Sequence, residues 1–272
     1  MTSIATNRAA IRVQYHGVGN ADLENQSFTR LASGRRINSA SDDAAGLFIA
    51  GRMKAQITGL ERAVQNSFDG VSLVNTAEAN LNEIRNMVLR MREIAVQMAN
   101  GIYLDNPDRG FAQIEIDQLI QQIDLIAENA NFNGVALLDG TMQNVGIQTG
   151  PTANERPSIF FKDNTTEGLG IDGVDVTTQA NAKAAMGTLE TALTSISDEL
   201  SRTGAYENRF GHTISVLEQT ATATKISRGR IMDADMASES TALSKAQVLS
   251  QANTAMLAQA NRAMSTVLML FN

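Results

Sequence analysis

An uninterrupted heptad repeat is the feature that most constrains how this chain can fold. From Ala182 to Ile231, the residues at alternating steps of four and three are mostly Ala, Met, Leu, Ile or Phe. The polar exceptions are Thr203, Glu207, Thr224 and Arg228. This spacing aligns the apolar side chains on one face of a helix, which would be roughly 75 Å long at 1.5 Å per residue. We therefore expect a rod whose apolar stripe needs other helices to cover it.

A second long helix is expected between residues 41 and 100. Its apolar positions keep the same rhythm, with one short step after Val74 that locally overwinds the packing without ending the helix. Before and after that step they are Met53, Ile57, Leu60, Val64, Ser67, Val71 and Val74, then Ala77, Leu81, Ile84, Val88, Met91, Ala95 and Met98. Ser41 or Asp42 is the expected N-cap. Asn100-Gly101 is expected to end the helix.

A shorter helix and a β insertion are expected between the two rods. Asn106-Pro107-Asp108 is typical of a helix start, and Phe132-Asn-Gly134 should end that helix. The heptad rhythm is then absent between residues 135 and 178. Within that stretch, Val145–Thr149 and Ser158–Phe161 predict a small hairpin, which a Gly-rich loop follows. At roughly 40 residues, the insertion is too small to fold as an independent domain.

Both ends of the chain carry repeats with coiled-coil spacing, and the N-terminal repeat is weaker than the C-terminal one. Near the C-terminus the seam has one polar position, Asn253, and otherwise comprises Ala242, Ala246, Leu249, Met256, Ala260, Ala263, Val267 and Leu270. Leu243 and Leu257 widen its stripe. Near the N-terminus, Ile4, Ile11 and Val18 follow heptad spacing, and Gly17 and Gly19 predict a bend or break. Because an isolated helix is marginal in water, these ends should order only when packed by other helices.

These patterns predict a mainly α fold: a long antiparallel helical bundle with coiled-coil terminal segments and a small β-hairpin insertion. The expected divisions are residues 1–40 and 236–272 for the terminal coiled-coil segments, residues 41–134 and 179–235 for the helical bundle, and residues 135–178 for the β/loop insertion. The low aromatic content, 4% with no Trp, suits helix-on-helix packing better than a β-sandwich.

Composition excludes several classes of function. A net charge of −7 without a long basic run argues against binding to nucleic acid and to anionic membrane surfaces. The absence of cysteine excludes disulfides and thiol catalysis. No secretory signal is visible at the start, and the apolar run Val267–Phe271 is far shorter than the roughly 20 residues of a transmembrane helix.

No motif predicts an enzyme. Gly168-Leu-Gly-Ile-Asp-Gly173 matches a dinucleotide-binding spacing, but it lacks the strand-to-helix context and carries an acid, so we interpret it as a loop. His16 and His212 lack metal-ligand spacing. The acids Asp233, Asp235 and Glu239 are interpreted as helix-capping residues. We therefore expect no catalytic residue, no cofactor and no metal.

Six motifs, in their order along the chain, resemble those of bacterial flagellin. The resemblance covers roughly residues 27–140 and 180–272. They are Leu31-Ala-Ser-Gly-Arg-Arg-Ile-Asn-Ser-Ala-Ser-Asp-Asp-Ala-Ala-Gly46, Arg90-Met-Arg-Glu-Ile-Ala-Val-Gln97, Phe132-Asn-Gly134, Glu207-Asn-Arg-Phe210, Ser227-Arg-Gly-Arg-Ile-Met-Asp-Ala-Asp235, and Ala246-Gln-Val-Leu-Ser-Gln-Ala-Asn253 with Leu257-Ala-Gln-Ala-Asn261.

The resemblance implies a secreted structural subunit that polymerises into the extracellular flagellar filament for motility. In that family the chain ends form an inner tube, the rods form an outer core, and the middle of the chain lies outside. The implied partners are further copies of the chain, an export chaperone, the type III export apparatus, and the hook-associated and cap proteins. The residues expected to pack between subunits are Ile4, Ile11, Val18, Leu243, Leu249, Met256, Leu257, Val267 and Leu270.

A second implied surface is a face for a host Toll-like receptor, matching Arg90, Ile94 and Glu115. From the spacing alone, Arg90 and Ile94 share one helix face, which an ordinary solvated patch would also explain. Ile94 replaces the Leu that is usual in the family, and Leu89 replaces the usual Gln.

Two alternatives to a filament subunit stay open at this point. A hook–filament junction protein has similar ends but forms a short ring rather than an indefinite polymer. A helical sensor or adaptor has similar heptads and would bind a signalling partner. The sequence leaves the filament's protofilament number and handedness undetermined, together with any glycosylation.

Overall fold

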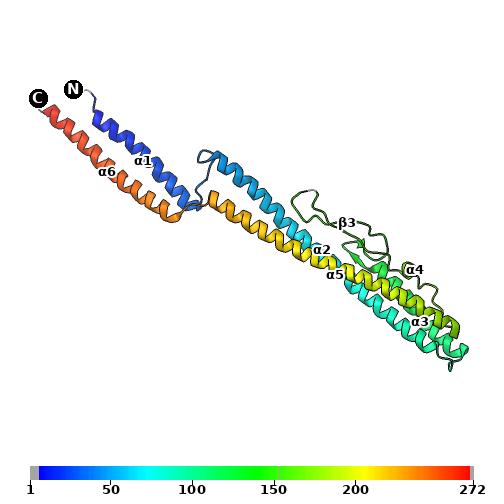
Figure 1. Ribbon diagram of the computed structural model, residues 1–272. Coiled ribbons are helices and arrows are strands. Elements are labelled where there is room, and N and C mark those ends of the chain that lie inside the picture. The colour runs from blue at the N-terminus through cyan, green and yellow to red at the C-terminus, as the bar shows by residue number, and fades with distance from the viewer. Residues whose placement is uncertain (1–5, 153, 270–272) are drawn as a thin grey trace. The chain divides into compact units, whose positions relative to one another are not determined.

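The computed structural model describes residues 6–152 and 154–269 and contains mainly long helices (Figure 1). The chain divides into two compact units, which are described separately. Unit 1 comprises Met1–Ile57 with Ala223–Asn272, and unit 2 comprises Thr58–Thr222. The expected mainly α fold with a small β insertion is confirmed.

Unit 1 is built around two antiparallel helices, α1 (Arg8–Ser33) and α6 (Met236–Met269), which lie side by side (Figure 1). The Asn7 side chain caps α1 by accepting a hydrogen bond from the Ala10 amide, and Gly34 ends the helix with a φ of 68°. Helix α1 continues through Gly17 and Gly19, so the break expected there is absent. Packing along α6 outweighs the helix penalty of roughly 1 kcal/mol for each glycine.

The connector before α2 (Ala44–Met98) is ordered by two adjacent aspartates. Asp43 accepts a hydrogen bond from the Gly46 amide at 2.8 Å and is therefore the N-cap of α2. Asp42 instead accepts from the backbone amides of Asn38 and Ser39 at 3.0 and 2.9 Å. The expected cap at Ser41 or Asp42 was wrong, because Asp42 stabilises the preceding turn.

The connector after α1 also pairs with the connector before α6. The Arg36 amide donates to the Met232 carbonyl at 2.7 Å, and the Ala234 amide donates to the Gly34 carbonyl at 3.0 Å. These bonds tie the segment after α1 to the end of α5 (Gln179–Met232). They satisfy backbone groups that the helix ends would otherwise leave unpaired.

Unit 2 packs the later part of α2 against α3 (Gly110–Asn129) and α5 around one large apolar core. The heptad positions of both rods supply this core. Fully buried examples are Val74, Ala77, Leu81, Ile84, Val88 and Met91 from α2, and Ala182, Leu189 and Ile196 from α5. The stripe of α5 is wider than the heptad predicted, since Ala185 and Ala192 are buried too. Both predicted rods are confirmed.

The turn between α2 and α3 differs from the expected helix start. A single π-type turn, η1 (Asp105–Arg109), precedes α3, and Asn106 within it has the extended angles φ −138° and ψ 125°. The helix therefore begins at Gly110 rather than at Pro107. The side chain of Arg109 occupies the turn and is only 3% exposed, a position that the sequence pattern did not reveal.

The region between α3 and α5 forms two short hairpins and one helical turn. Strands β1 (Asn131–Phe132) and β2 (Val135–Ala136) pair across Asn133-Gly134, whose φ values are 51° and 80°. This Asn-Gly turn was missed by the sequence analysis, which placed only a helix end there. Strands β3 (Val145–Gly146) and β4 (Ser158–Ile159) form the predicted hairpin, and α4 (Thr166–Leu169) follows it.

The insertion is an integral part of unit 2. Ile159, Phe161, Ile171 and Val176 are all 0% exposed and belong to the same apolar core as α2, α3 and α5. Asp124 of α3 accepts hydrogen bonds from the amide and hydroxyl of Thr166 at 2.8 Å, which holds α4 on α3. The insertion therefore completes the core of the bundle and is not an appendage.

Candidate functional site

The paired helices α1 and α6 contact each other through mostly small or polar residues. In α6, the residues that are not exposed recur at alternating steps of four and three: Glu239, Leu243, Ala246, Ser250, Asn253, Leu257, Ala260 and Met264. In α1 they are Ala10, Val13, Gly17, Asn20, Glu24, Ser27, Arg30 and Leu31. Among the described residues of these two helices, only Ser27 and Ala246 are fully buried. The pair is a coiled coil with a thin core.

Polar contacts at both ends of the pair fix its register. Asn7 Nδ2 donates to the Ala260 carbonyl at 3.1 Å and to Asn261 Oδ1 at 3.3 Å. Arg30 forms an ion pair with Glu239, with 3.8 Å between Arg30 Nη1 and Glu239 Oε2. Hydrogen bonds of this kind set alignment more than they add stability.

A shallow groove of about 300 Å³ runs between α1 and α6. Val13, Gly17 and Val18 line it from α1, with Asn253 and Leu257 opposite on α6. Asn253 Nδ2 is buried and has no hydrogen-bond partner among the described residues. A buried donor of this kind destabilises the isolated pair by roughly 1–3 kcal/mol.

Several large apolar side chains of the pair face away from it. Ile11 is 56% exposed, Val18 62%, Met256 58% and Leu249 39%. The C-terminal seam expected from the sequence was therefore offset: of its members with described side chains, only Ala246, Asn253 and Ala260 face α1. Its other described members, Ala242, Leu249, Met256 and Ala263, lie on exposed faces. The apolar stripe is thus left uncovered by this chain.

The residues predicted to pack between subunits fall into three groups. The first group, Ile11, Val18, Leu249 and Met256, is exposed. The second group, Leu243 and Leu257, is half-buried on the side of α6 that faces α1. Ile4, Leu270 and the side chain of Val267 lie outside the described residues.

The face around Arg90 on α2 carries a small ion-pair network. Arg90 Nε donates to Glu115 Oε1 of α3 at 2.8 Å, and Arg90 Nη1 lies 3.3 Å from Glu93 Oε2. The hydrogen bond from Glu115, more than that from Glu93, raises the pKa of Arg90 above its ordinary value. Ile94 is only 3% exposed and belongs to the core of unit 2. The expectation that Ile94 shares this surface was wrong, because α3 and α5 cover that side of α2.

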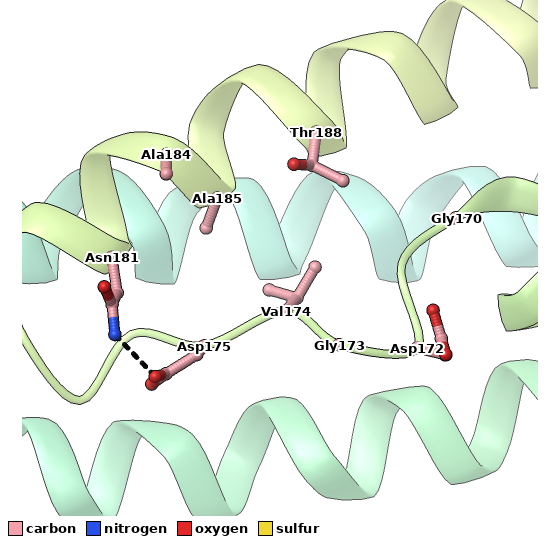
Figure 2. Close-up of a pocket in the computed structure, with 9 residues that line it drawn as sticks. All are labelled: Gly170, Asp172, Gly173, Val174, Asp175, Asn181, Ala184, Ala185 and Thr188. Atoms are coloured by element: carbon pink, nitrogen blue, oxygen red, sulfur yellow. Dashed lines mark hydrogen bonds between the residues drawn. The ribbon is translucent and has the colours of Figure 1, made fainter.

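The glycine-rich loop borders a pocket in unit 2 (Figure 2). The loop contributes Gly170, Asp172, Gly173, Val174 and Asp175, and α5 contributes Asn181, Ala184, Ala185 and Thr188. Asn181 Nδ2 donates to Asp175 Oδ2 at 2.6 Å. Hydrogen bonds from the backbone and side chain of Thr177, and then from Asn181, lower the pKa of Asp175. Asp172 and Asp175 place two carboxyl groups on the pocket, which disfavours a phosphate group there. Gly168 and Leu169 of the glycine-rich motif lie in α4, and the residues after them form the loop.

The acidic linker before α6 acts as a cap. Asp235 Oδ1 accepts hydrogen bonds from the Ala237 and Ser238 amides at 3.0 and 3.3 Å. Within the described ranges, no group of three or more His, Cys, Asp or Glu residues is placed to hold a metal ion. No helix in the described part of the chain is long and apolar enough to span a membrane.

Comparisons with known proteins agree with these features. Residues 4–143 match the family model described as the bacterial flagellin N-terminal helical region, and residues 186–271 match the C-terminal helical region. The chain is 36% identical to the flagellin FlaB2 of Treponema pallidum, over 93% of this chain and 94% of the relative.

Two solved structures resemble parts of the chain. The crystal structure of Bacillus cereus flagellin has 32% sequence identity and a TM-score of 0.51, covering 56% of this chain and 88% of that one. A structure described as a flagellar hook-associated protein from Vibrio parahaemolyticus has a TM-score of 0.60, covering 71% of this chain and 100% of that one. With the latter at only 13% identity, the likeness shows a shared fold and gives the junction-protein alternative little support.

Proposed function

The chain belongs to the bacterial flagellin family, and from this premise we propose that the exposed apolar face of the α1–α6 pair is the surface that joins its subunits. The protein is a structural subunit of the extracellular flagellar filament and not an enzyme. Its assembly partner is a further copy of the same chain.

The observation that carries this proposal is the division of side chains between the two sides of the pair. Mostly small and polar residues, with a few larger ones such as Leu243 and Leu257, hold α1 against α6. Ile11, Val18, Leu249 and Met256 face outward. Full burial of one such large apolar side chain contributes about 1.5–3 kcal/mol. Several of them per subunit supply a driving force that appears only when other subunits cover the face.

The chain divisions expected from the sequence give this surface its place in the polymer. We assign residues 1–40 and 236–272 to the inner tube, and residues 41–134 and 179–235 to the outer core. Residues 135–178 lie toward the outside in this assignment. The contacts between subunits must be head-to-tail, because a two-fold contact would close a dimer and end growth.

Substitution of one exposed residue tests this surface directly. Met256→Gln places a polar group where an apolar contact is required, so we expect filament elongation from short seeds to fall at least tenfold, the equivalent of about 1.4 kcal/mol. The readout is elongation followed by negative-stain electron microscopy.

The matched control for this test is Met256→Leu, which keeps the apolar character and should elongate nearly as the unmodified chain does. Both variants should keep the thermal unfolding temperature of the unmodified monomer, because Met256 is 58% exposed there. Normal elongation by Met256→Gln would refute the role of this face.

The same face is proposed as the one that an export chaperone covers before secretion through the type III apparatus. An exposed apolar helix pair is prone to premature self-association, and a chaperone that masks it would prevent this. Hook-associated and cap proteins would meet this face at the ends of the filament. Capture of the chaperone by the full chain, but not by a chain ending at Thr241, is the expected result.

A Toll-like receptor is the second proposed partner, and it concerns the exposed Arg90–Glu115 pair. Ile94 is buried, so it would support the position of α2 in the core and would not contact the receptor itself. Arg90→Ala and Glu115→Ala should each weaken binding of the receptor ectodomain to the monomer. Unchanged affinity in both variants would refute this face.

A further inference from the structure

A buried acid on α5 lies outside every surface described so far. Glu199 is 0% exposed, and its Oε2 atom has no hydrogen-bond partner among the described residues. Its Oε1 atom accepts one long hydrogen bond, from the Lys162 amide at 3.4 Å. A carboxylate in such a place loses its hydration without gaining matching partners.

The charges near Glu199 compensate it only weakly. Arg202 Nη1 lies 3.9 Å from Glu199 Oε2, at the limit of an ion pair, and the Arg202 side chain is 46% exposed. Lys162, from the segment after β4, contributes a second favourable charge, and Asp198 contributes an unfavourable one. Burial outweighs the hydrogen bond from Lys162 and both positive charges, so the pKa of Glu199 is raised above the ordinary value of 4.5.

The end of β4 and the residues after it, 159–162, pack beside Glu199. The buried side chains of Ile159 and Phe161 anchor them in the core, and three weaker contacts join them to α5. Tyr206 Oη donates to the Phe160 carbonyl at 3.5 Å, and the Arg202 guanidinium lies 5.9 Å from the centre of the Phe160 ring. The rings of Phe161 and Tyr206 meet edge to face at 6.3 Å. Residues 159–162 therefore dock on α5 directly beside an acid that prefers water when it is ionised.

We propose that Glu199 is a protonation-dependent latch that ties residues 159–162 to α5. When Glu199 is neutral, its burial costs little and the segment stays docked. When Glu199 is ionised, opening of the segment lets water reach the carboxylate, so the population of the open state increases. Unit 2 would thus carry a segment whose opening depends on the surrounding pH.

The direction of the pH effect follows from the difference in proton affinity between the two states. The pKa of Glu199 is higher when the latch is closed than when it is open, so closure is strongest at a pH below the ordinary carboxyl pKa. Closure weakens as the pH rises from the ordinary carboxyl pKa to the pKa that Glu199 has in the closed latch. The opening equilibrium changes about tenfold for each pH unit that separates the closed-latch and open-latch pKa values.

Amide hydrogen exchange of the monomer tests the latch. Protection factors for residues 159–162, corrected for the intrinsic pH dependence of exchange, should fall as the pH rises above the ordinary carboxyl pKa of 4.5 in the unmodified chain. In Glu199→Gln this fall should disappear, because the buried group no longer titrates. The matched control is Glu207→Gln, an exposed acid on the same helix, which should leave the fall unchanged.

Two results would overturn the latch. One is a protection factor that does not change with pH in the unmodified chain, and the other is the same fall in Glu199→Gln as in the control. If Glu199→Gln does not fold, the ¹³C chemical shift of the Glu199 carboxyl can be titrated in the unmodified chain. A midpoint at the ordinary carboxyl pKa would then reject the latch. All these measurements use monomer, so they are independent of filament assembly.

Discussion

Single buried polar residues decide how the ends of the helices are held. Arg109 is the clearest case, since its guanidinium donates to the carbonyls of Met98, Asn100 and Tyr103 at 2.7–2.9 Å. It also pairs with Asp105. Met98 is the last residue of α2, so Arg109 supplies a donor to a carbonyl at the helix end, and its positive charge lies at the negative end of the helix dipole. One side chain therefore closes the turn between α2 and α3.

Arg109→Met should destabilise unit 2 by roughly 2–4 kcal/mol, because it leaves several buried carbonyls without a donor while keeping a side chain of similar length. Chemical denaturation of the monomer measures this change. The matched control is Arg209→Met, an exposed arginine on α5 for which we expect a change within about 0.5 kcal/mol. Equal stability of the two variants would show that the Arg109 contacts contribute little.

Residue-scale features are those that the sequence predicted least well. Asp43 and Asp42 are adjacent acids, and only the structure shows which one caps α2 and which one holds the turn before it. Arg109 and Glu199 are buried, whereas charged side chains are normally exposed. The sequence pattern therefore placed neither of them in the interior. By its spacing, Ile94 shares a face of α2 with the exposed Arg90, but its burial depends on where α3 packs.

Helices were predicted far better than these residues because each carries a long periodic signal. The two rods appear in the structure close to their expected bounds, as α2 (Ala44–Met98) and α5 (Gln179–Met232). The terminal seam was predicted less accurately. Its strongest apolar positions face outward, and a heptad pattern does not say whether the covering helix belongs to the same chain or to another.

Helix α1 offers a test of how packing and helix propensity combine. Gly19 lies inside the helix, and a Cβ added there would have no heavy atom within 4 Å. Gly19→Ala should therefore stabilise α1 in the monomer by roughly 0.5–1 kcal/mol, measured as increased amide protection along α1.

Gly34→Ala is the opposite case in the same element. Gly34 has a φ of 68°, and an L-residue in that conformation costs roughly 1–2 kcal/mol, so the end of α1 should fray. If both substitutions changed protection in the same direction, local backbone conformation would not explain the difference between the two glycines.

At the scale of the whole molecule, the chain separates folding from assembly. Unit 2 has a large apolar core, to which the insertion contributes, whereas the α1–α6 pair buries little and exposes several large apolar side chains. A flagellin subunit organised in this way can exist as a folded monomer and still gain a strong driving force on joining a filament. Because the core of the pair is weak, we expect assembly to depend on both ends of the chain.

The most direct test of this account compares the full chain with a chain that ends at Thr241, each added to short filament seeds at raised salt. Elongation is followed by negative-stain electron microscopy, and circular dichroism and thermal unfolding report on unit 2. The account predicts long uniform filaments from the full chain, and no elongation but unchanged unfolding of unit 2 from the truncated chain. Filaments grown from the truncated chain would contradict the claim that the α1–α6 pair joins the subunits.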